Sequence, residues 1–295
     1  IFDVYIEYFN GTNMLGYPLT GEELVSYGSR IVSFFKDEPI VGGYLNGFFL
    51  ILLGFLANKY YFKQKKIIFL FFIICLLAIF FTGERSNFIK AFLGAIIFIF
   101  ALKNIDKKFK IIFFTIILIS ILTLLFNSQY LKLRYTTQIK SSLSGKSQYL
   151  MIYKSGLQVF KNNIWFGVGN KNYRIETCNT LASEGSSLRL RYEDKDFTDY
   201  WCTTHPHQIY IEFLSEHGLL GTLIVFFIFF KIIFSKFSLI LKESDYIQIG
   251  SLIFILFTFL PLLPSGAFFS NYSLTIFGIN LAIFYASNKN LNIFN

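Results

Sequence analysis

Long uncharged, apolar stretches alternate with short polar clusters along almost the whole chain. Most of these stretches approach the roughly 17 to 25 residues of a membrane-spanning helix, and the short third and fifth reach it when extended through Ser86 and Glu212. A soluble protein could bury such runs as core helices or strands, but seven are too many for one soluble domain of 295 residues. The pattern therefore predicts an all-α polytopic membrane bundle with seven spans, at residues 41–58, 67–83, 91–102, 111–130, 217–230, 247–266 and 267–288.

Lysine placement orients the predicted spans. The connections after spans one, three and five together hold 11 lysines, and such clusters mark the cytoplasmic side of a membrane protein. The opposite side then holds residues 1–40, the turn at Glu84-Arg85 and the long segment 127–206. We expect residues 1–40 to form an outward loop, and because no span precedes it, further spans are expected upstream.

The spans divide the chain into five predicted regions. An extracytoplasmic N-terminal segment occupies residues 1–40 and spans one to four occupy 41–126. A large periplasmic loop between spans four and five occupies 127–206. An interfacial helix with spans five to seven occupies 207–288, and residues 289–295 form a cytoplasmic tail.

The net charge of +9 divides in the same way. Topology explains the 11 cytoplasmic lysines, so little of the positive charge remains to indicate nucleic-acid binding. The loop 127–206 carries 11 basic against six acidic residues, a surplus suited to an anionic partner such as a phosphate-bearing lipid. Solubility alone also accounts for charges on an exposed loop.

Cysteines and cofactor motifs narrow the chemistry. Cys75 lies within an apolar stretch, whereas Cys178 and Cys202 both lie in the outward loop, where an oxidising compartment permits a disulfide. The three histidines have no metal-site spacing, and no glycine-rich nucleotide motif is present. We expect neither a metal nor a cofactor.

Arg85 and Lys90 are the first candidates for function. Both follow span two at the membrane boundary, where a charged side chain is costly and commonly functional. Arg85 could instead be a snorkelling interfacial residue or a partner of Glu84.

His207 is the second candidate. The run Thr203-Thr204-His205-Pro206 predicts a helix start, which places His207 at the positive end of the helix dipole and favours a neutral base. Beyond it, Glu212, Ser215 and Glu216 are expected to form the polar face of an interfacial helix, before Gly218 and Gly221 allow a bend into span five. His205 and His217 are assigned capping or surface roles, and the residue that orients His207 is left open between Glu212 and Asp199.

Four short motifs together resemble the superfamily of O-antigen ligases and O-antigen polymerases. They are His207-Gln208 followed after nine residues by Gly218-x-x-Gly221-Thr222, Gly83-x-Arg85-Ser86, Trp165-Phe166-Gly167-Val168-Gly169-x-x-x-Tyr173 and Phe2-Asp3-Val4-Tyr5-Ile6-x-Tyr8-Phe9-x-Gly11. They cover most of the chain in the family's order. The resemblance implies an all-helical bundle of about ten to fourteen spans with one large periplasmic loop, in the bacterial inner membrane.

The resemblance also implies glycan transfer from undecaprenyl pyrophosphate without metal or nucleotide. Carried over residue by residue, His207 matches the histidine that activates the acceptor hydroxyl, and Arg85 matches an arginine that holds the pyrophosphate. Relatives have a loop arginine where this chain has Lys146, so Lys146, Arg134 or Arg174 is expected to fill that role, with Lys90 as a further contact. Lysine offers a point charge where arginine offers a bidentate fork.

The acceptor distinguishes the family's branches. A ligase uses lipid A core, a polymerase uses another lipid-linked repeat, and a protein O-oligosaccharyltransferase uses Ser or Thr of an exported protein. The His-Gln motif is most similar to that of ligases. A transporter of lipid-linked sugar is the alternative from another class. It predicts paired broken helices and charged residues at the membrane midplane, and the predicted spans lack such charges.

Overall fold

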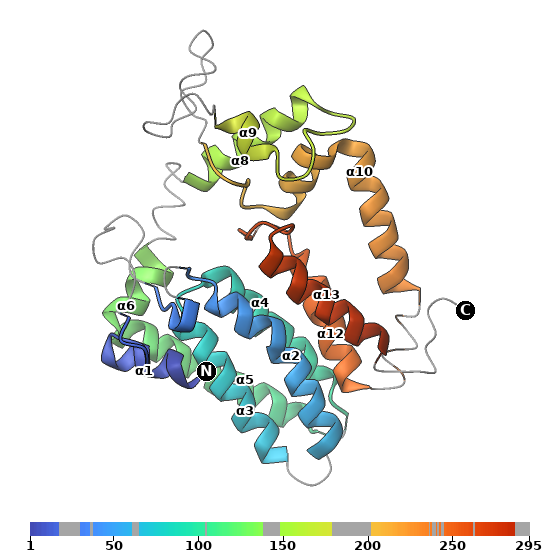
Figure 1. Ribbon diagram of the computed structural model, residues 1–295. Coiled ribbons are helices and arrows are strands. Elements are labelled where there is room, and N and C mark those ends of the chain that lie inside the picture. The colour runs from blue at the N-terminus through green and yellow to red at the C-terminus, as the bar shows by residue number, and fades with distance from the viewer. Residues whose placement is uncertain are drawn as a thin grey trace. The chain divides into compact units, whose positions relative to one another are not determined.

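In the computed structural model, the regular secondary structure of the described residues is helical (Figure 1). No β-strand occurs among the described residues, which confirms the all-α prediction. These residues are 1–17, 30–35, 38–60, 65–103, 105–137, 148–178, 202–235, 237, 240, 242, 245–261 and 263–286.

Each of the seven predicted spans falls on a helix. They are α2 (Val41–Tyr60), α3 (Lys65–Phe81), α4 (Arg85–Ala101), α5 (Lys107–Asn127), α10 (Ile209–Phe234), α12 (Tyr246–Thr258) and α13 (Asn271–Ala286). Within the described residues, three helical stretches are long and apolar enough to cross a membrane: Val41–Lys59, Lys107–Asn127 and Ile209–Phe234.

The last two spans are shorter than predicted. Helix α12 ends at Thr258 and α13 begins only at Asn271. Pro261 and Pro264 lie in the intervening segment, where proline removes a backbone donor and disrupts helical geometry.

Shorter helices occupy the segments that were predicted as loops. They are α1 (Phe2–Asn10), the 3₁₀ turn η1 (Ser33–Phe35), α6 (Gln129–Lys132), the π-turn η2 (Leu133–Thr137), α8 (Gln148–Asn162) and α9 (Tyr173–Thr177). The prediction of a plain loop over residues 1–40 was therefore wrong at its start. Tyr5 and Tyr8 of α1 pack on Phe81 of α3, so aromatic contacts fix this helix.

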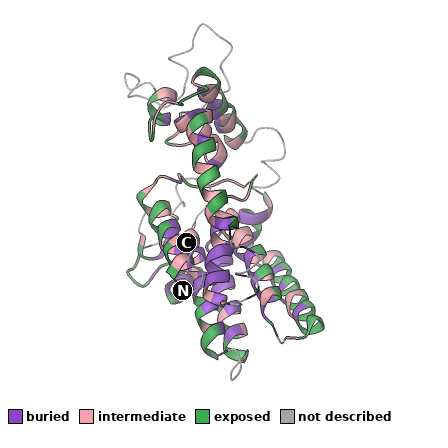
Figure 2. Cartoon of the chain, turned by 90° about the vertical axis from the view of Figure 1, so that its right-hand side faces the viewer, coloured by how far each residue is buried: buried purple, intermediate pink, exposed green. Residues whose placement is uncertain are grey.

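The chain divides into two compact units. Unit 1 comprises Ile1–Gln138, Lys236–Thr258 and Ile276–Asn295, and unit 2 comprises Ile139–Ser235 and Phe259–Thr275. The core of unit 1 lies among α2, α3, α4 and α12, whose buried side chains include Phe49, Phe72 and Phe98. Buried residues are purple in Figure 2. Helices α2 and α12 meet at Gly54 and Gly250, where an added Cβ would overlap the partner's backbone. Small residues permit this close helix packing.

Helices α5 and α10 present many large apolar side chains on their surfaces. On α5 these include Ile112, Ile116, Ile119 and Phe126, and on α10 they include Leu223, Ile224, Phe227 and Phe230. Water would make such surfaces unfavourable, whereas lipid accommodates them. This exposure fits the membrane class of the fold.

Candidate active site

A tight turn between α3 and α4 organises the charged residues of unit 1. Gly83 in this turn has a φ of +73°, in the left-handed region that favours glycine. A Cβ added at Gly83 would lie 2.8 Å from Tyr130 Oη and 3.0 Å from Arg134 Nε. The glycine therefore allows two polar side chains from the segment after α5 to approach the turn.

Arg134 is buried against this turn with an exposed fraction of 1%. Its Nη2 donates a hydrogen bond to the carbonyl oxygen of Gly83 at 3.2 Å, and Tyr130 Oη donates to that of Thr82 at 3.3 Å. Burying a guanidinium is costly unless polar groups surround it, and these carbonyls supply part of that environment. Arg134 stands on the π-turn η2, a rare element that often occurs at functional sites.

Two further arginines lie within electrostatic range of Arg134. Burial lowers the pKa of Arg134 to about 10, and repulsion from Arg30 and, more weakly, from Arg85 contributes to the shift. The three residues are called the arginine cluster below. At this pKa the Arg134 guanidinium stays charged at neutral pH, so three cations act on one turn, where the carboxylate of Glu84 balances part of their charge.

The structure thus brings together two predicted residues, Arg85 and Arg134, and adds Arg30, which sequence reasoning missed. Arg30 lies in a segment, residues 1–40, whose charged residues are mostly acidic. An arginine in an otherwise acidic segment was the available signal, but its partners lie at distant positions in the sequence.

Glu84 joins the start of α2 to the start of α4. Its carboxylate accepts hydrogen bonds from the backbone N–H groups of Gly42 and Gly43 and from Asn87 Nδ2, the last at 2.6 Å. Burial raises the pKa of Glu84, while these hydrogen bonds and the charge of Arg30 oppose the rise. Glu84 therefore serves to fix the turn beside Arg85.

The remaining predicted cations are distributed over both units. Lys90 is half-buried on α4 of unit 1, one and a half turns beyond Arg85. Arg174 is exposed on α9 of unit 2. Lys146 lies outside the described residues.

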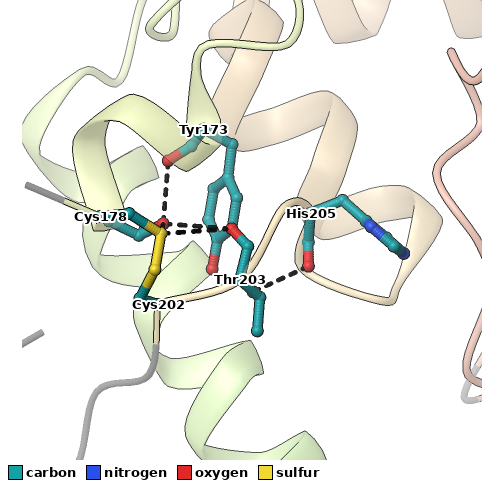
Figure 3. The surroundings of a disulfide bond; sticks show 6 residues. Tyr173, Cys178, Cys202, Thr203 and His205 are labelled. Atoms are coloured by element: carbon teal, nitrogen blue, oxygen red, sulfur yellow. Dashed lines mark hydrogen bonds between the residues drawn. A yellow bond between two sulfur atoms is a disulfide. The ribbon is translucent and has the colours of Figure 1, made fainter. Parts of the chain in front are cut away.

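In unit 2 a disulfide fixes the segment that leads to the histidines (Figure 3). Cys178, at the end of α9, is bonded to Cys202, with their Cα atoms 4.9 Å apart, which confirms the predicted pair. Directly after Cys202, the carbonyl of Thr203 accepts from Thr177 Oγ1 at 3.4 Å. Thr203 Oγ1 in turn donates to the carbonyl of His205 at 3.0 Å, so these contacts extend from the disulfide to the first histidine.

His207 has an unusual backbone conformation, with a φ of +52°. Its carbonyl accepts from Ser265 N at 2.9 Å, and its ring lies 4.0 Å from that of His205 and 5.8 Å from that of Tyr149, measured between centroids. A non-glycine residue in this region costs about 1–3 kcal/mol and commonly occurs at functional sites. Burial and the adjacent His207 lower the pKa of His205 to about 4, so His205 is neutral at pH 7.

The predicted helix start was placed too early. Helix α10 begins at Ile209, and its N-cap is Gln208, whose side-chain oxygen accepts from Ile211 N at 2.8 Å. Pro206 and His207 therefore precede the helix. His207 still stands next to the positive end of the helix dipole.

The predicted polar face of this helix was also wrong, because Glu212, Ser215 and Glu216 are buried. Glu212 accepts from the backbone N–H groups of Phe268 and Phe269, at 2.9 and 3.5 Å, and Glu216 accepts from Lys171 N at 2.9 Å. These carboxylates hold unit 2 together. Glu212, one of the two residues proposed to orient His207, thus binds the backbone N–H groups of Phe268 and Phe269. Asp199, the other proposed residue, lies outside the described residues.

Helix α10 is broken at Gly218, as the sequence predicted, where φ is +64° and ψ is −172°. The loop of residues 164–169 supplies the hydrogen bonds that the break removes. Val168 N and Gly169 N donate to the carbonyls of Ser215 and Glu216, and Leu219 N and Leu220 N donate to those of Ile164 and Trp165. Such backbone pairing explains both glycine motifs, because a Cβ at Gly167 or Gly218 would overlap the other segment's backbone.

A comparison with protein families adds an independent observation. The model of the O-antigen ligase family matches residues 70–226, more than half of the chain, and this range includes Arg85, Arg134 and His207. The chain belongs to the O-antigen ligase family. Membership implies a membrane glycosyltransferase of the O-antigen ligase or polymerase type, acting on lipid-linked glycans. Among curated proteins, none matches the chain.

Proposed function

We propose that this O-antigen ligase family member transfers a glycan from undecaprenyl pyrophosphate to a hydroxyl group of lipid A core. The transfer takes place at the periplasmic side of the bacterial inner membrane. The observation that carries the proposal is the buried Arg134, 1% exposed, within electrostatic range of Arg85 in a chain of this family. Three charged guanidinium groups in one place are costly to maintain unless they serve an anionic ligand.

The arginine cluster holds the pyrophosphate of the donor. Guanidinium groups donate paired hydrogen bonds to phosphate oxygens, and their charge stabilises the negative charge that develops as the sugar leaves. Lys90, Lys146 and Arg174 are further proposed contacts of the donor.

His207 acts as the general base. It removes the proton from the acceptor hydroxyl while the hydroxyl oxygen forms a bond to the anomeric carbon of the glycan. The bond from that carbon to the pyrophosphate oxygen breaks, and its electron pair leaves with the lipid pyrophosphate. Pyrophosphate is already a good leaving group, so the proposed step uses neither a nucleoside triphosphate nor a metal.

The test is expression of the full-length protein in a ligase-deficient host that makes lipid-linked O-antigen, followed by gel analysis of its lipopolysaccharide. Wild type should restore a ladder of long glycans, and His207→Ala and Arg134→Gln should abolish it at equal protein levels. Lys132→Gln removes an exposed cation two residues from Arg134 and should leave the ladder intact. Ladders that survive His207→Ala would refute the proposed base.

A wild-type protein that restores no ladder would refute lipid A core as the acceptor. The same extracts then show where the glycan goes. Longer lipid-linked chains would indicate a polymerase, and glycosylated exported proteins would indicate a protein O-oligosaccharyltransferase.

A further inference from the structure

Two buried carboxylates of α1 clamp the segment that follows Arg30. Glu7 is fully buried and accepts hydrogen bonds from Val32 N at 3.0 Å and Ser33 N at 2.7 Å. Asp3, 2% exposed, accepts from Ser33 Oγ and from Met14 N. Hydrogen bonds that buried N–H groups donate to charged acceptors are among the stronger ones in proteins, so this segment is held firmly.

The same segment is tied to the turn at Gly83. The backbone of Ile31 lies close enough to the hydroxyl of Tyr130 to act on its pKa, and that hydroxyl donates a hydrogen bond to the carbonyl of Thr82. Ile31 and Val32 are completely buried, which fixes the backbone immediately after Arg30. Consequently Tyr130 lies next to both the segment that follows Arg30 and the turn that Arg134 contacts.

We propose that Arg30 is a third contact for the donor pyrophosphate and that Asp3 and Glu7 are positioning residues that hold Arg30 in the arginine cluster. The inference rests on the proposed function. It extends the site to residues outside the range 70–226 that the family model matches.

Charge complementarity supports this assignment. The repulsion that Arg134 receives from Arg30 exceeds that from Arg85, so Arg30 belongs to the cluster at least as closely as the predicted residue. The lipid pyrophosphate gains a further negative charge when the sugar departs. A third guanidinium stabilises the bound donor as well as this product-like charge.

The experiment measures steady-state transfer by the full-length protein in lipid nanodiscs, with a lipid-pyrophosphate glycan as donor. Arg30→Gln should raise the donor KM and lower kcat/KM by about tenfold or more, as expected for a lost charge-assisted hydrogen bond. Arg30→Lys should recover part of the loss, because lysine supplies the charge without the fork. Lys132→Gln is the matched control for removal of one positive charge, and thermal unfolding of every variant verifies folding.

A double-mutant cycle separates positioning from plain stabilisation. Glu7→Gln should raise the donor KM in the wild-type background and have little further effect when Arg30 is already Gln. Equal effects of Glu7→Gln in both backgrounds would refute the positioning role. A donor KM for Arg30→Gln that equals that of Lys132→Gln would refute Arg30 as a contact.

These results are distinguishable from failure of the proposed function. Should Arg134→Gln and His207→Ala remove activity while Arg30→Gln does not, only the present inference is refuted. If all three variants keep full activity, the proposed function fails as well.

Discussion

Two glycines, Gly83 in unit 1 and Gly218 in unit 2, stand at the centre of the two candidate regions, yet they admit different neighbours. At Gly83 the missing Cβ makes room for the ends of two side chains, those of Tyr130 and Arg134. At Gly218 it makes room for the backbone of Trp165 and Phe166. Side-chain ends can shift by rotating, whereas a backbone held by hydrogen bonds cannot. The arginine cluster therefore retains some adaptability, and the region after the histidines is fixed.

The two regions also treat charge differently. Unit 1 buries a charged guanidinium and surrounds it with two more, whereas the histidine segment of unit 2 keeps an imidazole neutral by burial. Binding an anion requires charge before the substrate arrives, and abstracting a proton requires a base without one. The arginine cluster suits the proposed anion-binding task, and the neutral His205 adds no positive charge beside His207, the proposed base.

Replacing Gly218 with alanine should have the largest effect on this comparison. The added Cβ would overlap the backbone of Trp165 and Phe166, and the backbone angles at Gly218 are accessible essentially to glycine alone. We expect a loss of about 4 kcal/mol of stability and loss of the glycan ladder. Thermal unfolding in detergent measures the first, and gel analysis measures the second.

Gly278→Ala is the matched control, because Gly278 lies in helix α13 with no atom within 4 Å of an added Cβ. Alanine should be tolerated there. Similar stability of the two variants would contradict the rigid backbone contact at Gly218.

Removal of the disulfide should have the next largest effect. The double variant Cys178→Ala with Cys202→Ala opens a loop whose ends are 24 residues apart, which costs about 3 kcal/mol in the chain-entropy account. The segment to His207 then loses its anchor, so transfer should fall in the variant and in wild type treated with reductant. Cys75→Ala, which leaves the disulfide intact, should keep the response to reductant. An unchanged rate in reduced wild type would show that the disulfide does not support the histidine segment.

Gly83→Ala should have a smaller effect on stability but a clear effect on the donor. The backbone would be strained by about 1 kcal/mol at its φ of +73°, while Tyr130 and Arg134 could move by a few tenths of an ångström. The donor KM should rise more than kcat falls, because the displaced residue is a proposed binding group. Steady-state kinetics test this. A stability loss as large as that of Gly218→Ala would contradict the proposal that the neighbours of Gly83 can shift more easily than those of Gly218.

The smallest expected effect concerns His205 and pH. Its pKa is lowered from 6.5 to about 4 in the folded protein, so between these values the unfolded chain binds more protons than the folded one. Stability should therefore be complete above pH 6.5 and decrease as the pH falls toward 4, by about 1 kcal/mol after allowance for solvent screening. His205→Gln should unfold with a flatter pH dependence over this window. An identical pH profile for both proteins would show that His205 is not held neutral.

The hydrophobic pattern was enough to predict much of the helical framework. Seven apolar runs became helices, Gly218 became the bend, and Cys178 paired with Cys202. The helices follow from the apolar character of short stretches of sequence. The bend and the disulfide follow from residue types, glycine and cysteine, that commonly have these roles. Span boundaries near Pro261 and Pro264 were less accurate, because apolar residues continue through a segment that proline keeps from being helical.

The features that sequence could not provide all depend on contacts between distant segments. Glu212 and Glu216 had the spacing of a solvent-facing polar stripe, but backbone N–H groups of Phe268, Phe269 and Lys171 bind them in the interior. The charge of Arg30 acts on Arg134 and Tyr130, which lie about a hundred residues further along the chain. Neither arrangement leaves a periodic signal. The roles of Lys90, Lys146 and Arg174 stay predictions.

The loop of residues 164–169 has a consequence for how α10 can meet a lipid bilayer. A straight helix of its 26 residues would extend about 39 Å, which exceeds a hydrocarbon core of about 30 Å. A break would normally have to stay in water, since each exposed peptide group costs several kcal/mol in hydrocarbon. Here the loop takes up four of the peptide groups around Gly218. The chain can therefore change direction at the edge of the hydrocarbon layer without water molecules to hydrogen-bond these four peptide groups.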